Sequence, residues 1–239
     1  MKVKVLILCG GEGTRMRPLT YIIPKPLLPL GRKPILQHTI EFFKNKGFDD
    51  IVLAIGYLGD AIVKYFGDGG NFGVNIEYSI EKTALDTAGA ILNARDKLGK
   101  TFFAMNGDVI FSYSLNLLDL LNFHKSKGTI GTIVVKYIEN SKRFGIIDFN
   151  SDNTITRFIE KPQKEMSGYI NAGLYVFNDE IFEYIRPNSK VSLEKEVFPI
   201  LCEEGELSAY IYNDFWTDIG VPDDYEATLK NLDLLIKVK

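Results

Sequence analysis

The sequence is poor in the residues on which redox sites and thiolate metal sites depend. Its 239 residues include two cysteines, Cys9 and Cys202, which lie far apart and have no CxxC partner or neighbouring histidine. A disulfide framework or a zinc site built on thiolates therefore has no support. We expect both cysteines to be reduced thiols that pack in the interior, and we expect His38 and His124 to have packing or surface roles.

Long apolar runs and an excess of one charge are also missing. No run approaches the roughly 20 apolar residues that cross a bilayer, and residues 1–4 are not followed by the longer apolar segment of a signal peptide. The net charge of −3 lacks the basic surplus of a general nucleic-acid binder. We therefore expect a cytoplasmic protein that binds neither membranes nor nucleic acid, with one domain built on one substantial core.

A glycine-rich loop after a short apolar run carries the most information. Residues 3–8 are β-branched and aliphatic with little alternation, which is typical of a central parallel strand. Residues 10–17 (GGEGTRMR) follow, and their glycines leave main-chain N–H groups free to point at one anion. The two arginines add groups that match phosphate geometry. The loop predicts polyphosphate binding, although glycines at such a place also serve simply to turn the chain, and neither a P-loop nor a dinucleotide fingerprint is present.

Strands and helices alternate along the first part of the chain. Further strand-like runs cover residues 51–55, 74–80, 101–105 and 129–137. Helix-like patterns cover 34–46, 60–66, a stretch that ends near 98, and 115–127. This alternation predicts a doubly wound sheet. From residue 144 onward we expect a hairpin over 146–159, strands at 169–177 and 207–212, and helices at 179–184, 193–202 and 222–237.

Three charged residues stand at places where they could meet a ligand. Asp108 follows the strand at 101–105, and ligands of open α/β sheets lie beyond the carboxyl ends of such strands. Asp218 is framed by aromatic and turn residues near the end of the chain. Lys25 lies between two prolines that stiffen the backbone. Each also has a plain structural interpretation, as a turn aspartate or a solvent-facing lysine.

Two further stretches contain residues suited to contact a ligand. Glu81 precedes a small-residue loop at 83–90, and its carboxylate could accept from a base amine or imino group, although Asp86 or Thr87 there can equally cap a helix. Asn171 and Gly173 interrupt the apolar strand at 169–177, which indicates that something approaches its face.

Six motifs in a fixed order resemble those of the sugar-1-phosphate nucleotidylyltransferases. They are GGEGTRMRPLT at 10–20, PKPLLPL at 24–30, NGD at 106–108, EKP at 160–162, NAGLYVF at 171–177 and WTDIG at 216–220. The resemblance covers essentially the whole chain. Within the family, the sequence is most similar to the mannose-1-phosphate guanylyltransferase branch and its heptose-1-phosphate and N-acetylmuramate-1-phosphate relatives.

The resemblance implies an α/β fold of the glycosyltransferase-A-like nucleotidyltransferase type. This fold is a Rossmann-like, doubly wound, mostly parallel mixed sheet with a small inserted sugar-binding β subdomain. Residues 1–140 would form the nucleotide-binding core and 141–215 the sugar-binding portion. Residues 216–239 would supply the second metal aspartate and the closing helix.

The resemblance also assigns roles to residues of this chain. Arg15, Lys25, Asp108 and Asp218 would be catalytic, with Lys25 on the reacting α-phosphate and the two aspartates on Mg²⁺ or another divalent cation. The nucleotide would contact Leu8, Gly10, Gly11, Gly13, Thr14, Arg15, Lys25, Glu81, Thr87, Ala88 and Gly89. The sugar phosphate would contact Asn106, Gly107, Gly145, Glu160, Lys161, Asn171 and Gly173.

The implied activity joins a sugar-1-phosphate to an NTP and releases pyrophosphate, with GTP and mannose-1-phosphate as the preferred pair. Relatives often read Pro-Leu-Gly-Thr where this chain has Ala-Leu-Asp-Thr at 84–87, so uridylyl or thymidylyl transfer to glucose-, heptose- or amino-sugar-1-phosphates stays an alternative. A non-sugar phosphate such as phosphocholine conflicts with the EKP and NAGLYVF motifs. A catalytically silent nucleotide-sugar sensor is the alternative from another class. A homo-oligomer is compatible with the resemblance.

Overall fold

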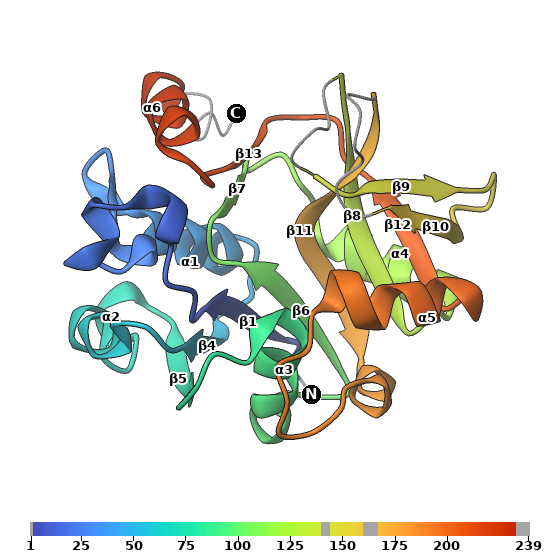
Figure 1. Cartoon of the computed structure of the whole chain (residues 1–239), viewed down its shortest axis with the longest axis horizontal. Coiled ribbons are helices and arrows are strands. Elements are labelled where there is room, and N and C mark those ends of the chain that lie inside the picture. Colours follow the sequence, from blue (N-terminus) through green and yellow to red (C-terminus); the bar gives the residue numbers. More distant parts are fainter. Residues whose placement is uncertain (1, 140–143, 160–166, 233–239) are drawn as a thin grey trace.

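The fold is built around four parallel strands that form one side of a nine-stranded sheet. The computed structural model describes residues 2–139, 144–159 and 167–232. These parallel strands stand in the spatial order β6, β1, β4, β5, with β5 at the edge, and their bounds are Thr101–Asn106, Lys4–Cys9, Asp50–Ile55 and Asn75–Ile80. Figure 1 shows β1 and its neighbours in the middle of the molecule. The strands expected at 51–55, 74–80 and 101–105 are therefore confirmed.

Helices cover both faces of these strands. Along β1, Val5, Ile7 and Cys9 join one apolar cluster and Leu6 joins the other, because successive side chains of a strand point to opposite faces. The first cluster includes residues of α1 (Ile35–Asn45), α2 (Gly59–Phe66) and α4 (Leu117–Lys127). The second includes residues of α3 (Asp86–Asn93) and α5 (Phe198–Glu203). This arrangement confirms the predicted doubly wound sheet.

The antiparallel part of the sheet is organised by one long strand. β11 (Gly168–Asn178) lies between β6 and β8 (Gly131–Ile138) and runs antiparallel to both. The hairpin of β9 and β10 (Ile146–Phe149 and Ile155–Ile159) pairs with its first residues, and β12 (Leu207–Ile211) runs parallel to β8 at the edge. A strand from the second half of the chain thus separates β6 from β8. The predicted mixed sheet with an antiparallel insertion is confirmed.

Several short elements differ from the sequence interpretation. Residues Asp179–Tyr184 form a 3₁₀ helix, and the helix expected at 193–202 begins with a wider π turn, Leu193–Val197, before α5. Two pairs of very short strands were not expected: β2 with β3 (Pro29–Leu30 and Lys33–Pro34), and β7 with β13 (Val109–Phe111 and Trp216–Asp218). The closing helix α6 has the bounds Pro222–Lys230. The second short pair turns out to be central to the site.

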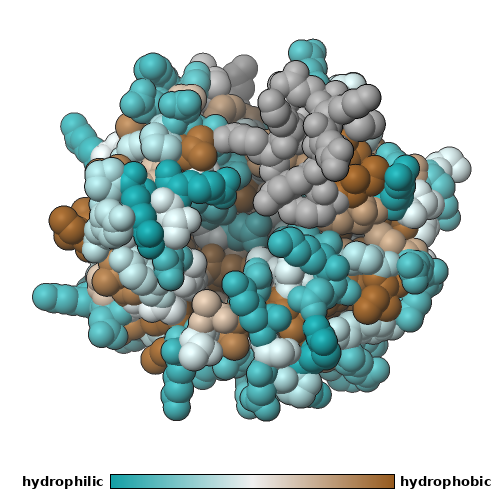
Figure 2. Space-filling model, viewed as in Figure 1, coloured by the Kyte–Doolittle hydropathy of each residue, from teal (hydrophilic) through white to brown (hydrophobic). Residues whose placement is uncertain are grey.

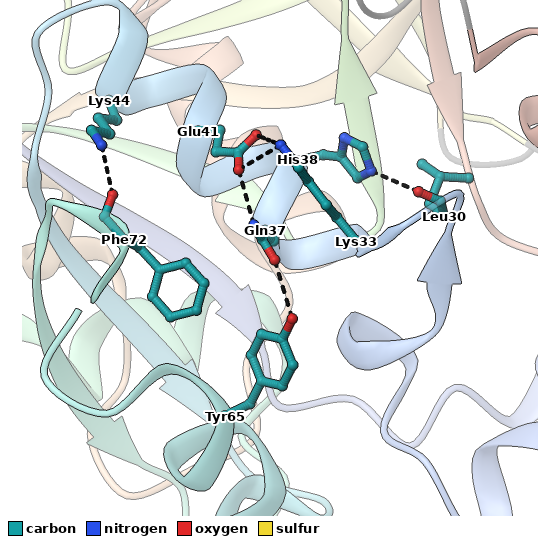
Figure 3. A network of polar contacts seen from close by, with 8 residues as sticks. All are labelled: Leu30, Lys33, Gln37, His38, Glu41, Lys44, Tyr65 and Phe72. Carbon is teal, nitrogen blue, oxygen red and sulfur yellow. Dashed lines mark hydrogen bonds and ion pairs between the residues drawn. The ribbon is translucent and has the colours of Figure 1, made fainter. Parts of the chain in front are cut away.

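Polar contacts around α1 hold the segment that carries Lys25. Figure 3 shows Lys33 Nζ donating to both carboxylate oxygens of Glu41, at 2.8 and 2.7 Å, while Gln37 Nε2 donates to the same carboxylate at 2.9 Å. His38 Nε2 lies 2.8 Å from the Leu30 carbonyl oxygen, at the end of the proline-rich stretch. The helix is joined to the neighbouring region by Tyr65 OH donating to Gln37 at 3.2 Å and Lys44 donating to the Phe72 carbonyl at 2.7 Å.

Two expectations from the composition can be compared with the structure. Cys9 and Cys202 form no disulfide; Cys9 is buried and Cys202 partly buried, and burial raises the pKa of both thiols, that of Cys202 to about 11. His124 is 1% exposed and its Nδ1 lies 2.9 Å from Thr132 Oγ1, which confirms a packing role. In the described part of the chain, none of the helices has the length and apolarity to cross a membrane.

Candidate active site

The two aspartates singled out in the sequence lie side by side. β7 and β13 form an antiparallel ribbon in which Asp218 pairs with Val109. The Ile219 N–H donates to the main-chain carbonyl of Asp108 at 2.8 Å. Asp108 and Asp218 therefore occupy adjacent positions on the ribbon, although one follows a central strand and the other stands near the end of the chain.

A small apolar cluster beneath the ribbon holds this arrangement together. Its buried members come from the glycine-loop region, the proline-rich segment and the two short strands: Met16, Leu28, Leu30, Ile35, Ile110 and Ile219. Tyr225 of α6 packs against it and its hydroxyl donates to the Pro29 carbonyl. Because these segments share one core, the acidic pair and the glycine loop keep a fixed relation to each other.

Asp108 and Asp218, the acidic pair, have too little positive charge around them to balance both carboxylates. The pKa of Asp218 is raised from 3.8 to about 7, first because its carboxyl is buried and then because Asp108 is near. Lys25 and Arg15 act in the opposite direction on the same pKa. A third cation between the carboxylates would remove their mutual repulsion.

Lys25 forms an ion pair with one member of the acidic pair. Its Nζ lies 2.6 Å from Asp108 Oδ2, and the residue is 9% exposed. Lys25 begins the 3₁₀ turn Lys25–Leu27 between two prolines, so its backbone has little freedom. Lys25 lines a cavity beside Asp108, and the alternative of a solvent-facing lysine is wrong.

The glycine loop borders a cavity of about 500 Å³. The predicted site residues in its wall are Leu8, Gly10, Gly11, Gly13, Thr14, Arg15, Lys25, Glu81, Thr87, Asn106, Gly107 and Asp108. Gly13 has a φ of +61°, and a Cβ there would come within 3.0 Å of Thr20 and 3.1 Å of Lys25. Glycine is required at this position because the loop must turn tightly against Lys25. Figure 2 shows this face of the molecule hollowed near its middle, with hydrophilic side chains around the hollow.

Glu81 stands at one end of this cavity. One carboxylate oxygen accepts the Leu85 N–H at 3.2 Å, and the other lies over Gly10, where a Cβ would approach it to 2.3 Å. The pKa of Glu81 is raised, mainly by burial and also by Asp86, against the effect of the Leu85 N–H. Asp86 has a φ of +63°, uncommon for a residue other than glycine, and it also lines the cavity.

Ala88 and Gly89 do not line either of the cavities described here. Both donate their N–H groups to the Val191 carbonyl, at 3.0 and 3.2 Å, and Ala88 is fully buried. Thr87 does reach the cavity, and its hydroxyl donates to Glu194 at 3.0 Å. The small residues at 88–89 thus allow the loop to pack against the 189–193 segment.

A second cavity, of about 210 Å³, adjoins the first. The predicted site residues in its wall are Arg15, Asn106, Asp108, Gly145, Asn171, Gly173 and Asp218. Arg15, Asn106 and Asp108 line both cavities, so the two meet at these residues. Gly107 belongs to the larger cavity, although it was predicted for the sugar phosphate. Glu160 and Lys161 lie outside the described residues.

Several residues in the two walls were given no role in the sequence interpretation, among them Trp216, Lys190 and Glu194. Trp216 lines the smaller cavity and its Nε1–H donates to the Ala172 carbonyl at 2.8 Å, which ties β13 to β11. Lys190 lines the larger cavity and Glu194 the smaller one. The WTDIG motif contained a signal for Trp216, whereas Lys190 and Glu194 belong to a stretch whose pattern indicates a helix start.

The residues present fit a divalent cation. Among the described residues there is no group of three or more His, Cys, Asp or Glu side chains that could hold a metal. Mg²⁺, however, is usually held by one or two carboxylates together with substrate phosphates. Asp108 and Asp218 supply two adjacent carboxylates at the junction of the cavities, so phosphate oxygens of a substrate would have to complete the coordination.

Comparisons with known proteins agree with this geometry. The chain matches the family model for nucleotidyl transferases over residues 4–233. It is 42% identical to a mannose-1-phosphate guanyltransferase of Saccharomyces cerevisiae, over 98% of this chain and 66% of that protein. It is 41% identical to the protein of that name from Schizosaccharomyces pombe, over 93% of this chain and 62% of that protein. The chain thus spans slightly less than two thirds of these relatives.

A solved structure covers the whole architecture. HddC from Yersinia pseudotuberculosis superposes with a TM-score of 0.83 at 28% identity, over 96% of this chain and 99% of that chain. The same protein complexed with GMP-PN gives a TM-score of 0.81. The family model covers nearly the entire sequence, and the structural match extends over the same length. The chain is therefore a member of the nucleotidyl transferase family.

Proposed function

We propose that this protein transfers a nucleotidyl group from an NTP to a sugar-1-phosphate, and that the preferred pair is GTP and mannose-1-phosphate. The observation that carries the proposal is the junction of two cavities at Arg15, Asn106 and Asp108. The larger cavity, with its glycine loop, suits a nucleoside triphosphate. The smaller one suits a sugar phosphate. A reaction between the two ligands would take place where the cavities meet.

The reaction is an in-line displacement. An oxygen of the sugar phosphate forms a bond to the α-phosphorus, and the bond from this phosphorus to the bridging oxygen of pyrophosphate breaks. A sugar phosphate needs no general base because its second pKa is about 6 and it is largely dianionic at neutral pH. This agrees with the absence of both histidines from the walls of the two cavities.

Repulsion between anions is the main barrier, so cations have to supply most of the rate. We assign Lys25, which lines the larger cavity, to the α-phosphate, and Arg15, which lines both cavities, to phosphate oxygens of either substrate. Asp108 and Asp218 would hold Mg²⁺, which neutralises phosphate charge when it is bound. Asn106 stands at the same junction and can orient a phosphate or a hydroxyl group.

The chemistry of Glu81 supports guanine over the other bases. A carboxylate only accepts hydrogen bonds and has two oxygens side by side. Guanine presents two adjacent donors, N1–H and the N2 amino group, whereas uracil presents one donor between two acceptors and adenine presents a donor beside an acceptor. The guanyltransferase names of the relatives and the GMP-PN complex of HddC support the same choice.

A substrate matrix tests the proposal. Purified protein with Mg²⁺ is assayed for pyrophosphate release with four NTPs against mannose-, glucose-, heptose- and glucosamine-1-phosphate. GTP with mannose-1-phosphate is expected to give the highest kcat/KM. A higher value for UTP or dTTP would overturn the base assignment while leaving the reaction class intact.

Absence of turnover with every pair would overturn the reaction class. Calorimetric binding of GTP or GDP-mannose in that case would favour the catalytically silent sensor. The matched control is a protein with Asp108→Asn and Asp218→Asn, which keeps both cavities but removes both carboxylate charges. Pyrophosphate release by this control would show that the activity comes from a contaminant.

A further inference from the structure

One buried tyrosine contacts residues in the wall of the smaller cavity. Tyr175 of β11 is 0% exposed, yet its hydroxyl oxygen accepts a hydrogen bond from Asn171 Nδ2 at 2.8 Å. A polar group that is removed from water without partners is costly, so a buried hydroxyl is usually retained for the bonds it makes. The sequence alone suggests a core residue here, because Tyr175 stands in an apolar strand.

The bond from Asn171 crosses an irregularity in the sheet. Asn171 pairs with Val135 and Tyr175 with Ile133, so the three residues 172–174 lie opposite a single residue of β8. Gly173 has a φ of +76°, and its N–H donates to Asn171 Oδ1 at 2.9 Å. Such bulges re-aim side chains next to active sites. Asn171 therefore closes the bulge on one side, and Tyr175 anchors Asn171 from below.

The same hydroxyl also has Asn106 as a neighbour. The side chain of Asn106 is a hydrogen-bonding neighbour of Tyr175, and a Cβ at position 173 would come within 2.9 Å of Asn106 Nδ2. Asn106 Oδ1 is buried and has no hydrogen-bond partner among the described residues. The phenol proton needs an acceptor, and a half-turn of the Asn106 amide would present this oxygen to it.

The side chains of Asn106 and Asn171 thus have the same hydroxyl group, that of Tyr175, as a neighbour. Both residues line the smaller cavity, and the side chains of both are hydrogen-bonding neighbours of the Tyr175 hydroxyl. We propose that Tyr175 is a positioning residue that fixes these two amides and thereby sets the affinity for the sugar-1-phosphate. The inference rests on the proposed function for the identity of the ligand, and it adds a residue whose hydroxyl does not touch either substrate.

The aromatic ring of Tyr175 has a separate structural role. It stacks on Phe177 with the ring centres 5.3 Å apart and lies 5.7 Å from Phe198. A phenylalanine at 175 would keep these contacts and would remove the hydroxyl alone. Tyr175→Phe is therefore the variant that separates positioning from packing.

The experiment compares Michaelis constants for the two substrates. In Tyr175→Phe, the loss of one or two hydrogen bonds is expected to raise KM for the sugar-1-phosphate about 5- to 30-fold. KM for the NTP should rise clearly less, because Asn106 is the one member of this network that lines the larger cavity, and the glycine loop and Glu81 lie outside it. The control is Tyr78→Phe, which removes a phenol hydroxyl that donates to the Gly67 carbonyl at 2.6 Å and lines neither cavity. This control should leave both constants unchanged.

A double variant tests whether the effect passes through Asn171. If it does, Tyr175→Phe should raise KM by a smaller factor in an Asn171→Ala background than in the wild type, and the remaining rise would pass through Asn106. Additive effects of the two changes would overturn the proposal. A fall in thermal stability of Tyr175→Phe without a difference between the two KM values would also overturn it, because that is the result of a purely structural role.

Calorimetry separates this inference from the proposed function. If no substrate pair releases pyrophosphate, the binding of mannose-1-phosphate to the wild-type protein and to Tyr175→Phe is measured directly. Weaker binding by the variant, in the same 5- to 30-fold range expected for the lost bonds, would support the positioning role even though the reaction class had failed. Equal binding by both proteins, or no binding by either, would overturn it.

Discussion

The two cavities are built in different ways. The wall of the larger one uses main chain: the glycine loop follows β1 directly, and the parallel strands bring the ends of β1 and β6 to the same edge. The wall of the smaller one uses side chains from segments scattered over the chain, from Arg15 to Asp218, and it depends on a bulge in β11. One half of the site is a local consequence of a motif, and the other exists only when distant strands have paired.

Changing the acidic pair should have the largest effect, because this pair stands where the two halves meet. Asp108→Asn and Asp218→Asn are each expected to lower kcat by about 10³-fold, the usual loss when a charge-stabilising group is removed. The fold should survive, and circular dichroism would verify this. Asp223→Asn, at the exposed start of α6, is the control for a carboxylate lost nearby. An activity within threefold of wild type in either site variant would contradict the assignment.

A change in Glu81 should affect the larger cavity alone. Glu81→Gln replaces one acceptor by a donor, and this pattern suits uracil better than guanine. The ratio of kcat/KM for GTP to that for UTP should fall by about 10- to 100-fold, as expected for one or two polar contacts. KM for the sugar phosphate should not change.

Glu12→Gln is the matched control for the change in Glu81. Glu12 lines the same cavity and pairs with Arg17 at 2.8 Å, so the variant makes the same charge change without touching Glu81. If both variants shift the base ratio equally, general electrostatics explains the effect and base recognition by Glu81 is wrong.

A change in Trp216 should affect the smaller cavity alone. Trp216→Phe removes the bond from Nε1–H to the Ala172 carbonyl, which lies within the bulge. The loss of this hydrogen bond should weaken sugar-phosphate binding by about 1 kcal/mol, which raises KM for the sugar phosphate about 5-fold. The NTP constant is measured in the same assay, and a parallel rise in both constants would mean that the two halves are not independent.

The smallest effect concerns the scaffold under the smaller cavity. Burial lowers the pKa of His124 below its usual value of 6.5, and the ring contacts Thr132 of β8. Since the unfolded chain then binds the proton more readily, this histidine stabilises the fold above about pH 6.5, and its contribution is lost as the pH falls towards the folded-state pKa. Because a single proton is involved, this histidine can change the free energy of unfolding by at most about 1.4 kcal/mol per pH unit.

Urea unfolding between pH 7.5 and 5 measures this slope. In His124→Asn, the amide can replace Nδ1 as a partner of Thr132, and the slope over this range should be shallower than in the wild type. An unchanged slope would assign the acid sensitivity to other groups. Hydrogen exchange in β8 and β11 at both pH values would show whether the antiparallel part opens before the parallel part.

The difference between the locally built cavity and the cavity built from distant segments also explains which features could be predicted from the sequence. The apolar runs of β1, β4 and β6 are long enough to be read as strands, and Asp108 could be placed because it follows one of them. β7 and β13 have three residues each, and β2 and β3 have two, so no periodicity can reveal them. The six motifs nevertheless pointed to Asp218 without any knowledge of the ribbon that holds it.

The direction in which the residues of a loop face was harder to predict than the place of the loop in the sequence. Ala88 and Gly89 are small, and small residues serve equally well against a ligand or against a neighbouring segment; the sequence alone could not show that both donate to the Val191 carbonyl. Tyr175 presents the opposite case, since nothing in an apolar strand indicates that its hydroxyl lies between two amides. Lys190 reaches the larger cavity because 189–193 packs on the loop, a pairing between distant parts of the chain.

The β7–β13 ribbon also has a consequence for synthesis of the protein. Asp108 leaves the ribosome with the parallel strands, and by then the glycine loop and Lys25 have already emerged. The partner strand with Asp218 is translated about a hundred residues later, at the slow pace of roughly 5–20 residues per second. For several seconds a nascent chain therefore carries Asp108 without its partner, and the acidic pair is completed only once β13 has been made.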